Sequence, residues 1–87
     1  MKKVKLIVFK STKPTCKNCS QALIEAEQVK AQMPDVIDLE VYTSMDQEAN
    51  RFGVISTPTV IINNKIVSIG KPVPSARLKE LVEKELN

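Results

Sequence analysis

Two cysteines separated by two residues are the part of this sequence best suited to chemistry. Cys16 and Cys19 are the chain's only cysteines, and Lys17 and Asn18 lie between them. On a helix, residues three apart share one face, so the two sulfurs come within reach of a disulfide bond. The thiolate is the reactive form of cysteine, and a thiol with a pKa of about 8.5 is only about 3% ionised at neutral pH. The pair therefore predicts redox chemistry if its surroundings stabilise one thiolate.

A helix start is predicted where the cysteines stand. The spacing of apolar residues predicts a helix over Cys16–Gln32. Unpaired backbone N–H groups and the helix macrodipole would stabilise a negative charge on Cys16 in the first turn, and Lys13 and Lys17 add positive charge nearby. Cys19 lies one turn further in and is expected to be less exposed. The apolar positions predicted to share the buried face are Cys16, Cys19, Leu23, Ala26, Val29 and Met33.

This asymmetry predicts a two-step exchange. The Cys16 thiolate attacks a disulfide in a client protein and forms a mixed disulfide. Cys19 then attacks Cys16, which releases the reduced client and leaves a Cys16–Cys19 disulfide. A flavoprotein or another thiol reductase is expected to restore the dithiol, and no cofactor beyond this redox-active pair is expected.

Three other interpretations of the pair stay open. Two cysteines can simply pack on the apolar face of a helix. Two thiolates also suit Cu(I), whereas a tetrahedral zinc site needs more ligands than one pair supplies. Copper carriers with such a pair usually have the order β-α-β-β-α-β and end on a strand, while this chain ends on an amphipathic helix. A non-catalytic adaptor, in which the fold serves only as a docking surface, is the third alternative.

Length and composition narrow the possible functions. Residues 1–87 are enough for one compact domain. A content of 43% hydrophobic and 26% charged residues is ordinary for a globular protein, and the formal net charge is +3. The absence of histidine excludes Ser-His-Asp and Cys-His catalysis and any imidazole metal site. Nucleic-acid binding is not expected, because Phe9, Tyr42 and Phe52 are the only aromatic residues that could stack on bases.

The N-terminal residues predict neither export nor membrane insertion. Met1, Lys2 and Lys3 resemble the charged start of a signal peptide, but the apolar run over Leu6–Phe9 is short and bounded by lysines. A secretory segment needs roughly 7–15 apolar residues and a membrane span about 20. We therefore expect a cytoplasmic protein, most simply a monomer, in a compartment where a close cysteine pair is more often catalytic than structural.

The rest of the chain predicts an α/β domain. Strands alternate with helices in the order β-α-β-α-β-β-α, and a parallel crossover followed by a hairpin makes a mixed four-stranded sheet. Asn63 and Asn64 tolerate the positive φ of a tight hairpin turn, Ser75 is predicted to cap the final helix, and Glu80 is predicted to pair with Lys84. The expected strands are Val4–Phe9, Val36–Val41, Thr59–Ile62 and Ile66–Ile69, with a short helix between Ser44 and Gly53 and a final helix from Ser75 to Leu86.

A second motif carries a family resemblance. The stretch over Phe52–Thr59 reads Phe-Gly-Val-Ile-Ser-Thr-Pro-Thr. Together with the cysteine pair it resembles the thioredoxin superfamily, in particular its small glutaredoxin-like thioredoxins, and implies a thioredoxin fold over nearly the whole chain. The resemblance implies that Pro58 is cis and lies against the cysteines. It also implies that the Thr57 backbone pairs with an extended substrate segment and that Gly70 lies beside the active site.

The sequence also departs from that family. Thr15 stands where thioredoxins have tryptophan, and the first strand lacks the buried aspartate that in thioredoxins assists proton transfer to the resolving cysteine. Glu40 on the second strand could partly substitute for it, with a solvated strand-end carboxylate as the favoured alternative. Gly70 leads into Lys71-Pro72 and not into the acidic pair with which glutaredoxins hold glutathione. Lys13 is the remaining candidate contact for a glutathione carboxylate, with a solvated loop lysine as the alternative.

Overall fold

The computed structural model describes residues 3–11, 17–43, 47, 53 and 57–86. Every predicted strand and both long helices are present, and their described ends differ from the predicted ends by at most two residues. The short helix expected between Ser44 and Gly53 lies almost entirely outside the described residues, although Gln47 is helical. The elements are β1 (Val4–Lys10), α1 (Lys17–Gln32), β2 (Ile37–Thr43), β3 (Thr59–Ile62), β4 (Lys65–Ile69) and α3 (Ser75–Leu86).

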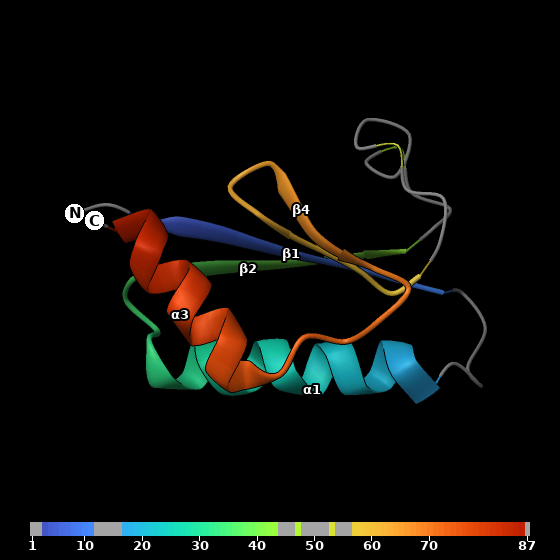
Figure 1. Ribbon diagram of the computed structural model, residues 1–87, viewed down its shortest axis with the longest axis horizontal. Helices are drawn as coiled ribbons and strands as arrows, with labels where there is room; N and C mark the ends of the chain where they lie inside the picture. Colours follow the sequence, from blue (N-terminus) through green and yellow to red (C-terminus); the bar gives the residue numbers. More distant parts are fainter. Residues whose placement is uncertain (1–2, 12–16, 44–46, 48–52, 54–56, 87) are drawn as a thin grey trace.

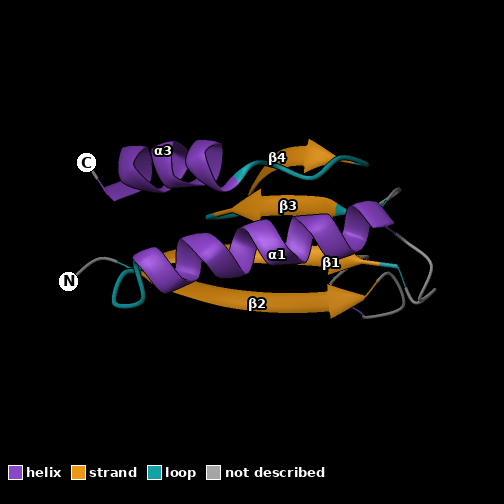
Figure 2. Cartoon of the chain, turned by 90° about the horizontal axis from the view of Figure 1, so that it is seen from below, coloured by secondary structure: helices purple, strands orange, loops and turns teal. Residues whose placement is uncertain are grey.

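The four strands form one mixed sheet in the order β2-β1-β3-β4. Strands β1 and β2 are parallel and are joined through α1, whereas β1 with β3 and β3 with β4 are antiparallel. Helices α1 and α3 lie on the same face of this sheet (Figures 1 and 2). The mixed sheet predicted from the element order is therefore confirmed.

Strand β1 is buried on both of its faces, as its continuous apolar run predicts. Leu6 and Val8 point into the core beneath α1 and α3. On the opposite face Phe9 packs against Tyr42 with ring centroids 5.5 Å apart, and Ile7 belongs to the same cluster. The core under the helices consists of Val4, Leu6, Val8, Ala22, Ala26, Val29, Ile37, Val60, Ile62, Val73, Leu78 and Val82.

The buried face of α1 differs slightly from the prediction. Cys19, Ala26 and Val29 are buried as expected, but the third expected position is Ala22, while Leu23 is only partly buried. Leu23 lies at the flank of the stripe because one residue turns the helix by about 100°. Met33 follows the last residue of α1 and packs only partly against the core.

The hairpin between β3 and β4 turns at two asparagines, as predicted. Asn63 and Asn64 have φ angles of 49° and 68°. Asn63 also extends the ladder to β1: its side-chain Oδ1 accepts a hydrogen bond from the Lys5 N–H at 2.9 Å, and its own N–H donates to the Lys5 carbonyl at 3.0 Å. The turn is therefore fixed by both backbone and side-chain bonds.

Two predictions about α3 are wrong. The Leu78 N–H donates to the carbonyl of Pro74 at 2.9 Å, so Pro74 occupies the cap position and Ser75 is the first helical residue. Ser75 does not cap the helix; its own N–H donates a hydrogen bond to the Glu25 carboxylate on α1 at 3.3 Å. Glu80 does not pair with Lys84, because Arg77 approaches its carboxylate from the preceding turn at 3.1 Å.

Candidate redox site

Cys19 lies in the first turn of α1 with 4% of its surface exposed. The prediction that this thiol is sheltered is confirmed. Cys19 is disulfide-bonded. Cys16, the only other cysteine of the chain, and Lys13 lie outside the described residues, so the structure does not test their predicted roles.

A backbone N–H group contacts the sulfur of Cys19. Ser11 directly follows the last residue of β1, and its N–H donates a hydrogen bond to the Cys19 Sγ at 3.3 Å. Such a donor stabilises a sulfur anion more than a neutral thiol. Sequence reasoning missed this contact because any non-proline residue at position 11 supplies the same donor.

Pro58 forms the second part of the site. The Thr57–Pro58 peptide bond is cis, as the family resemblance implied. Pro58 is buried, whereas Thr57, whose backbone is expected from the resemblance to pair with a substrate segment, is partly exposed.

Gly70 lies beside this proline. Its N–H donates to the Pro58 carbonyl at 2.7 Å, and its φ angle is +80°, in the region that disfavours residues with a Cβ. The bond places Gly70 next to the cis proline; that Gly70 belongs to the active site stays a prediction. The glycine allows the chain to turn at the end of β4 while its N–H stays bonded to the Pro58 carbonyl.

The sheet brings the cysteine and the proline to the same end. Phe9 pairs with Thr59, the residue after Pro58. Ser11, which contacts Cys19, comes two residues after Phe9. In Figure 1 the start of α1, the end of β1, the start of β3 and the end of β4 all lie at one end of the molecule. Segments from four elements thus lie at the same end of the molecule.

Glu40, the carboxylate considered for proton transfer, has a different partner. Its Oε2 lies 3.7 Å from the Lys5 Nζ, and both side chains are partly exposed. This arrangement agrees with the alternative of a solvated carboxylate.

Within the part of the chain that the structure describes, no helix has the length and apolar character needed to cross a bilayer.

Comparison with known proteins identifies the family. Residues 2–83 match the family described as thioredoxin domain. The chain belongs to the thioredoxin family. It is 36% identical to thioredoxin of Methanocaldococcus jannaschii over 88 residues, which covers 99% of this chain and 100% of that protein. It is 35% identical over 71 residues to a probable thioredoxin of Methanothermobacter marburgensis, covering 79% of this chain and 81% of that protein.

Solved structures agree with this membership. A structure described as thioredoxin-2, a component of malaria parasite protein secretion machinery, superposes with a TM-score of 0.78 at 25% identity, covering 94% of this chain and 82% of that one. Chloroplastic thioredoxin z has a TM-score of 0.79 at 19% identity, with coverages of 98% and 80%, which supports the fold alone. The chain is thus a thioredoxin-type thiol–disulfide oxidoreductase with the α/β thioredoxin fold.

Proposed function

We propose that this thioredoxin-family chain reduces protein disulfides by dithiol exchange through Cys16 and Cys19. The observation that supports the proposal most strongly is the environment of Cys19: a buried sulfur in the first helical turn, engaged in a disulfide and contacted by the Ser11 N–H. Cys16 is its proposed disulfide partner, since the chain holds no third cysteine.

The reaction conserves both electrons and protons. The Cys16 thiolate attacks one sulfur of the client disulfide, a Cys16–client bond forms, and the client's second sulfur leaves as a thiolate. Cys19 gives up its proton, which a leaving client thiolate takes up through solvent, and attacks the Cys16 sulfur; the Cys16–client bond breaks and the client's first sulfur leaves as a thiolate. The client gains two electrons and the Cys16–Cys19 pair loses two. The Ser11 N–H favours the step at Cys19, because it stabilises the anion that must form on a sheltered sulfur.

The residues around Pro58 would hold the client. The exposed part of Thr57 offers backbone groups to an extended client segment, and the buried Pro58 and Gly70 give this edge a fixed shape through their 2.7 Å bond. Lys13 is proposed as a further contact for a negatively charged group on the substrate. A rigid backbone edge recognises main-chain groups and therefore suits many different clients.

The partners follow from the electron balance. A client that accepts two electrons must be matched by a donor, and a flavoprotein or other thiol reductase is proposed for that role. We propose further that the protein acts in the cytoplasm and as a monomer, where such a donor keeps the dithiol reduced.

A reduction assay tests the proposal. Purified wild-type chain with dithiothreitol as electron source is expected to accelerate the reduction of a disulfide-bonded test protein. Cys16→Ser is expected to lower the rate to that of dithiothreitol alone, while its far-UV circular dichroism stays unchanged. Equal rates for wild type and Cys16→Ser would refute the proposal. Stoichiometric Cu(I) binding without any acceleration would refute it as well and would support a copper carrier.

A further inference from the structure

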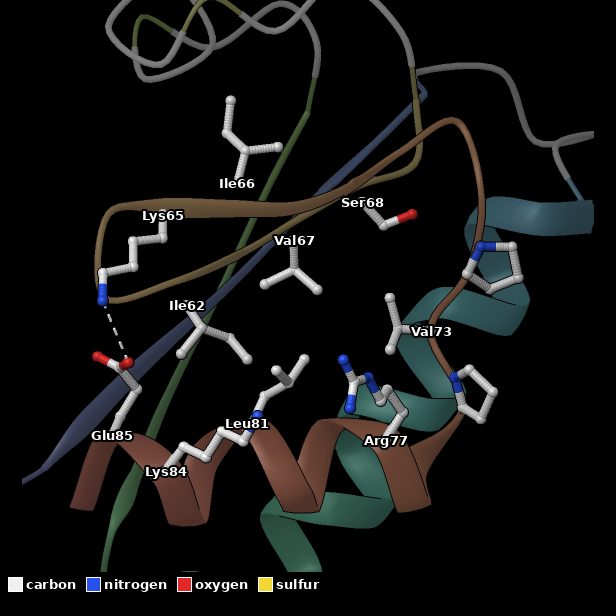
Figure 3. A pocket seen from close by; sticks show the side chains of 12 residues that line it. Ile62, Lys65, Ile66, Val67, Ser68, Val73, Arg77, Leu81, Lys84 and Glu85 are labelled. Atoms are coloured by element: carbon white, nitrogen blue, oxygen red, sulfur yellow. Dashed lines mark hydrogen bonds and ion pairs between the residues drawn. The ribbon is translucent and has the colours of Figure 1, made fainter. Parts of the chain in front are cut away.

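A groove of about 450 Å³ separates β4 from α3 (Figure 3). Helix α3 makes its main contacts with α1 and β1 and fewer with β4, which leaves this space open. Among the strands that the structure describes, β4 is the last of the sheet, so one of its edges has no neighbouring strand. One face of β4 thus lies across the groove from α3, and the outer edge of the strand is next to it.

The floor of the groove is apolar. Ile62 and Val73 are buried there, and Leu81 is partly buried. Val67 points into the same space in Figure 3, whereas Ile66 points to the other side of β4. Val67 and the next residue, Ser68, both line the groove because β4 is irregular here: Val60 pairs with Ser68 and Ile61 with Ile66, which leaves Val67 as an extra residue.

The rim of the groove is positively charged. Lys65, Arg77 and Lys84 line it, against one carboxylate, Glu85. That carboxylate is already held by Lys65 at 3.3 Å and by the Asn63 side chain at 3.0 Å. Arg77 pairs with Glu80, but both side chains are more than half exposed, so water screens this pair. An acidic ligand would therefore meet a favourable potential.

The other face of β4 is apolar and exposed. Ile66 pairs with the buried Ile61, and Ile69 pairs with Thr59, so both isoleucines lie on the face opposite to α3. They are 46% and 45% exposed. A strand added beside β4 would alternate its side chains between these two faces, with apolar residues over the isoleucines and acidic residues over the groove.

We propose that the β4 edge binds an extended segment of a redox partner in which apolar and acidic residues alternate. Backbone groups of the edge supply hydrogen bonds, and the two faces select the side chains. The redox nature of the partner rests on the proposed function. It is supported by the closeness of the two regions along the chain, because Pro72, which lines the groove, comes two residues after the glycine that is bonded to Pro58. A second copy of the chain fits less well, since its own rim would bring like charges together.

A binding measurement tests this proposal. The probe is a fluorescein-labelled peptide of about seven residues with alternating valine and glutamate and no cysteine, long enough to span β4. Fluorescence anisotropy is expected to show saturable binding to the wild-type chain that weakens with added salt. A peptide with lysine in place of glutamate is expected not to bind.

Matched variants locate the binding site. Arg77→Glu combined with Lys84→Glu is expected to weaken peptide binding at least about tenfold. Lys79→Glu, on the same helix but outside the groove, is expected to change binding less than about twofold. Ile66→Ser, at an exposed position that does not threaten folding, is expected to weaken binding as well.

Three results would overturn the proposal: no binding of the acidic peptide, equal binding of the lysine peptide, or unchanged binding by the groove variants. A concentration-dependent dimer in sedimentation that Ile66→Ser abolishes would also overturn it and would identify a second copy as the occupant. Failure of the reductase assay with intact peptide binding would refute the proposed function but leave the binding of acidic segments at the β4 edge in place.

Discussion

The core beneath the sheet and the redox end of the same sheet are built in different ways. The core is made of apolar side chains from strands and helices, such as Val8, Val60 and Leu78. The redox end relies on the backbone: a cis peptide before Pro58, a positive φ at Gly70 and the N–H of Ser11. Stability and chemistry are therefore carried by different parts of the molecule, and substitutions should separate them.

Leu78→Ala should have the largest effect on stability. Leu78 is fully buried between α3 and the sheet, and truncation of a buried leucine leaves a cavity that costs about 2–5 kcal/mol. Urea unfolding followed by circular dichroism measures this loss. Disulfide reduction per folded molecule should stay at the wild-type rate, and a loss of rate in the fully folded protein would mean that the two regions are not separable.

Gly70→Ala should affect both regions. A Cβ at φ +80° costs about 1–2 kcal/mol, and any shift of this residue moves the N–H bonded to Pro58. We expect a higher KM for a protein disulfide in addition to the lower stability. Gly53→Ala is the matched control: its φ is +68°, and an added Cβ would meet no atom within 4 Å. It should lose similar stability with an unchanged KM, and equal kinetics for the two variants would exclude a role for Gly70 in substrate binding.

Glu25→Ala should cost about 1 kcal/mol. Its carboxylate accepts a hydrogen bond from the Ser75 N–H at the positive end of α3. In most helices the side chain of the capping residue is the acceptor for such an N–H. Ser75→Ala should cost less than half as much, because Ser75 is inside the helix and Pro74 occupies the cap position. Thermal unfolding of both variants checks the order. A larger loss of stability for Ser75→Ala than for Glu25→Ala would show that the Ser75 side chain caps α3.

Lys5→Ala should have the smallest effect, below about 0.5 kcal/mol. The Lys5–Glu40 pair spans 3.7 Å, and its side chains are 47% and 32% exposed, so water and salt screen it. Denaturant unfolding at low and high salt measures the contribution. A loss above 1 kcal/mol that persists in high salt would contradict this prediction and show that the surface pair contributes to stability as much as buried contacts do.

The sequence predicts side-chain patterns better than backbone contacts. The apolar run of β1, the asparagine turn and the element order were predicted because they depend on burial and on local φ preferences. The Ser11–Cys19 contact and the Glu25–Ser75 bond were not, because each joins residues that only the folded chain brings together. Glu80 was assigned the wrong partner because helical spacing alone cannot choose between Arg77 and Lys84.

The site was predicted in part. Cys19 is sheltered and Pro58 is cis, and the second of these expectations came from the family resemblance. The bond between Gly70 and Pro58 was found only in the structure. The groove between β4 and α3 had no signal in the sequence. It depends on how α3 packs against α1 and β1, which the apolar pattern of either helix does not specify.

The central claim is that sheltered Cys19 resolves a mixed disulfide formed at Cys16. Mass spectrometry of each cysteine variant, after reaction with a disulfide-bonded test protein, tests it most directly. Cys19→Ser should accumulate a covalent adduct through Cys16. Wild type should show none because Cys19 resolves the adduct, and Cys16→Ser should show none because its remaining sulfur is only 4% exposed. An adduct that forms through Cys19 in Cys16→Ser as fast as through Cys16 in Cys19→Ser would contradict the account.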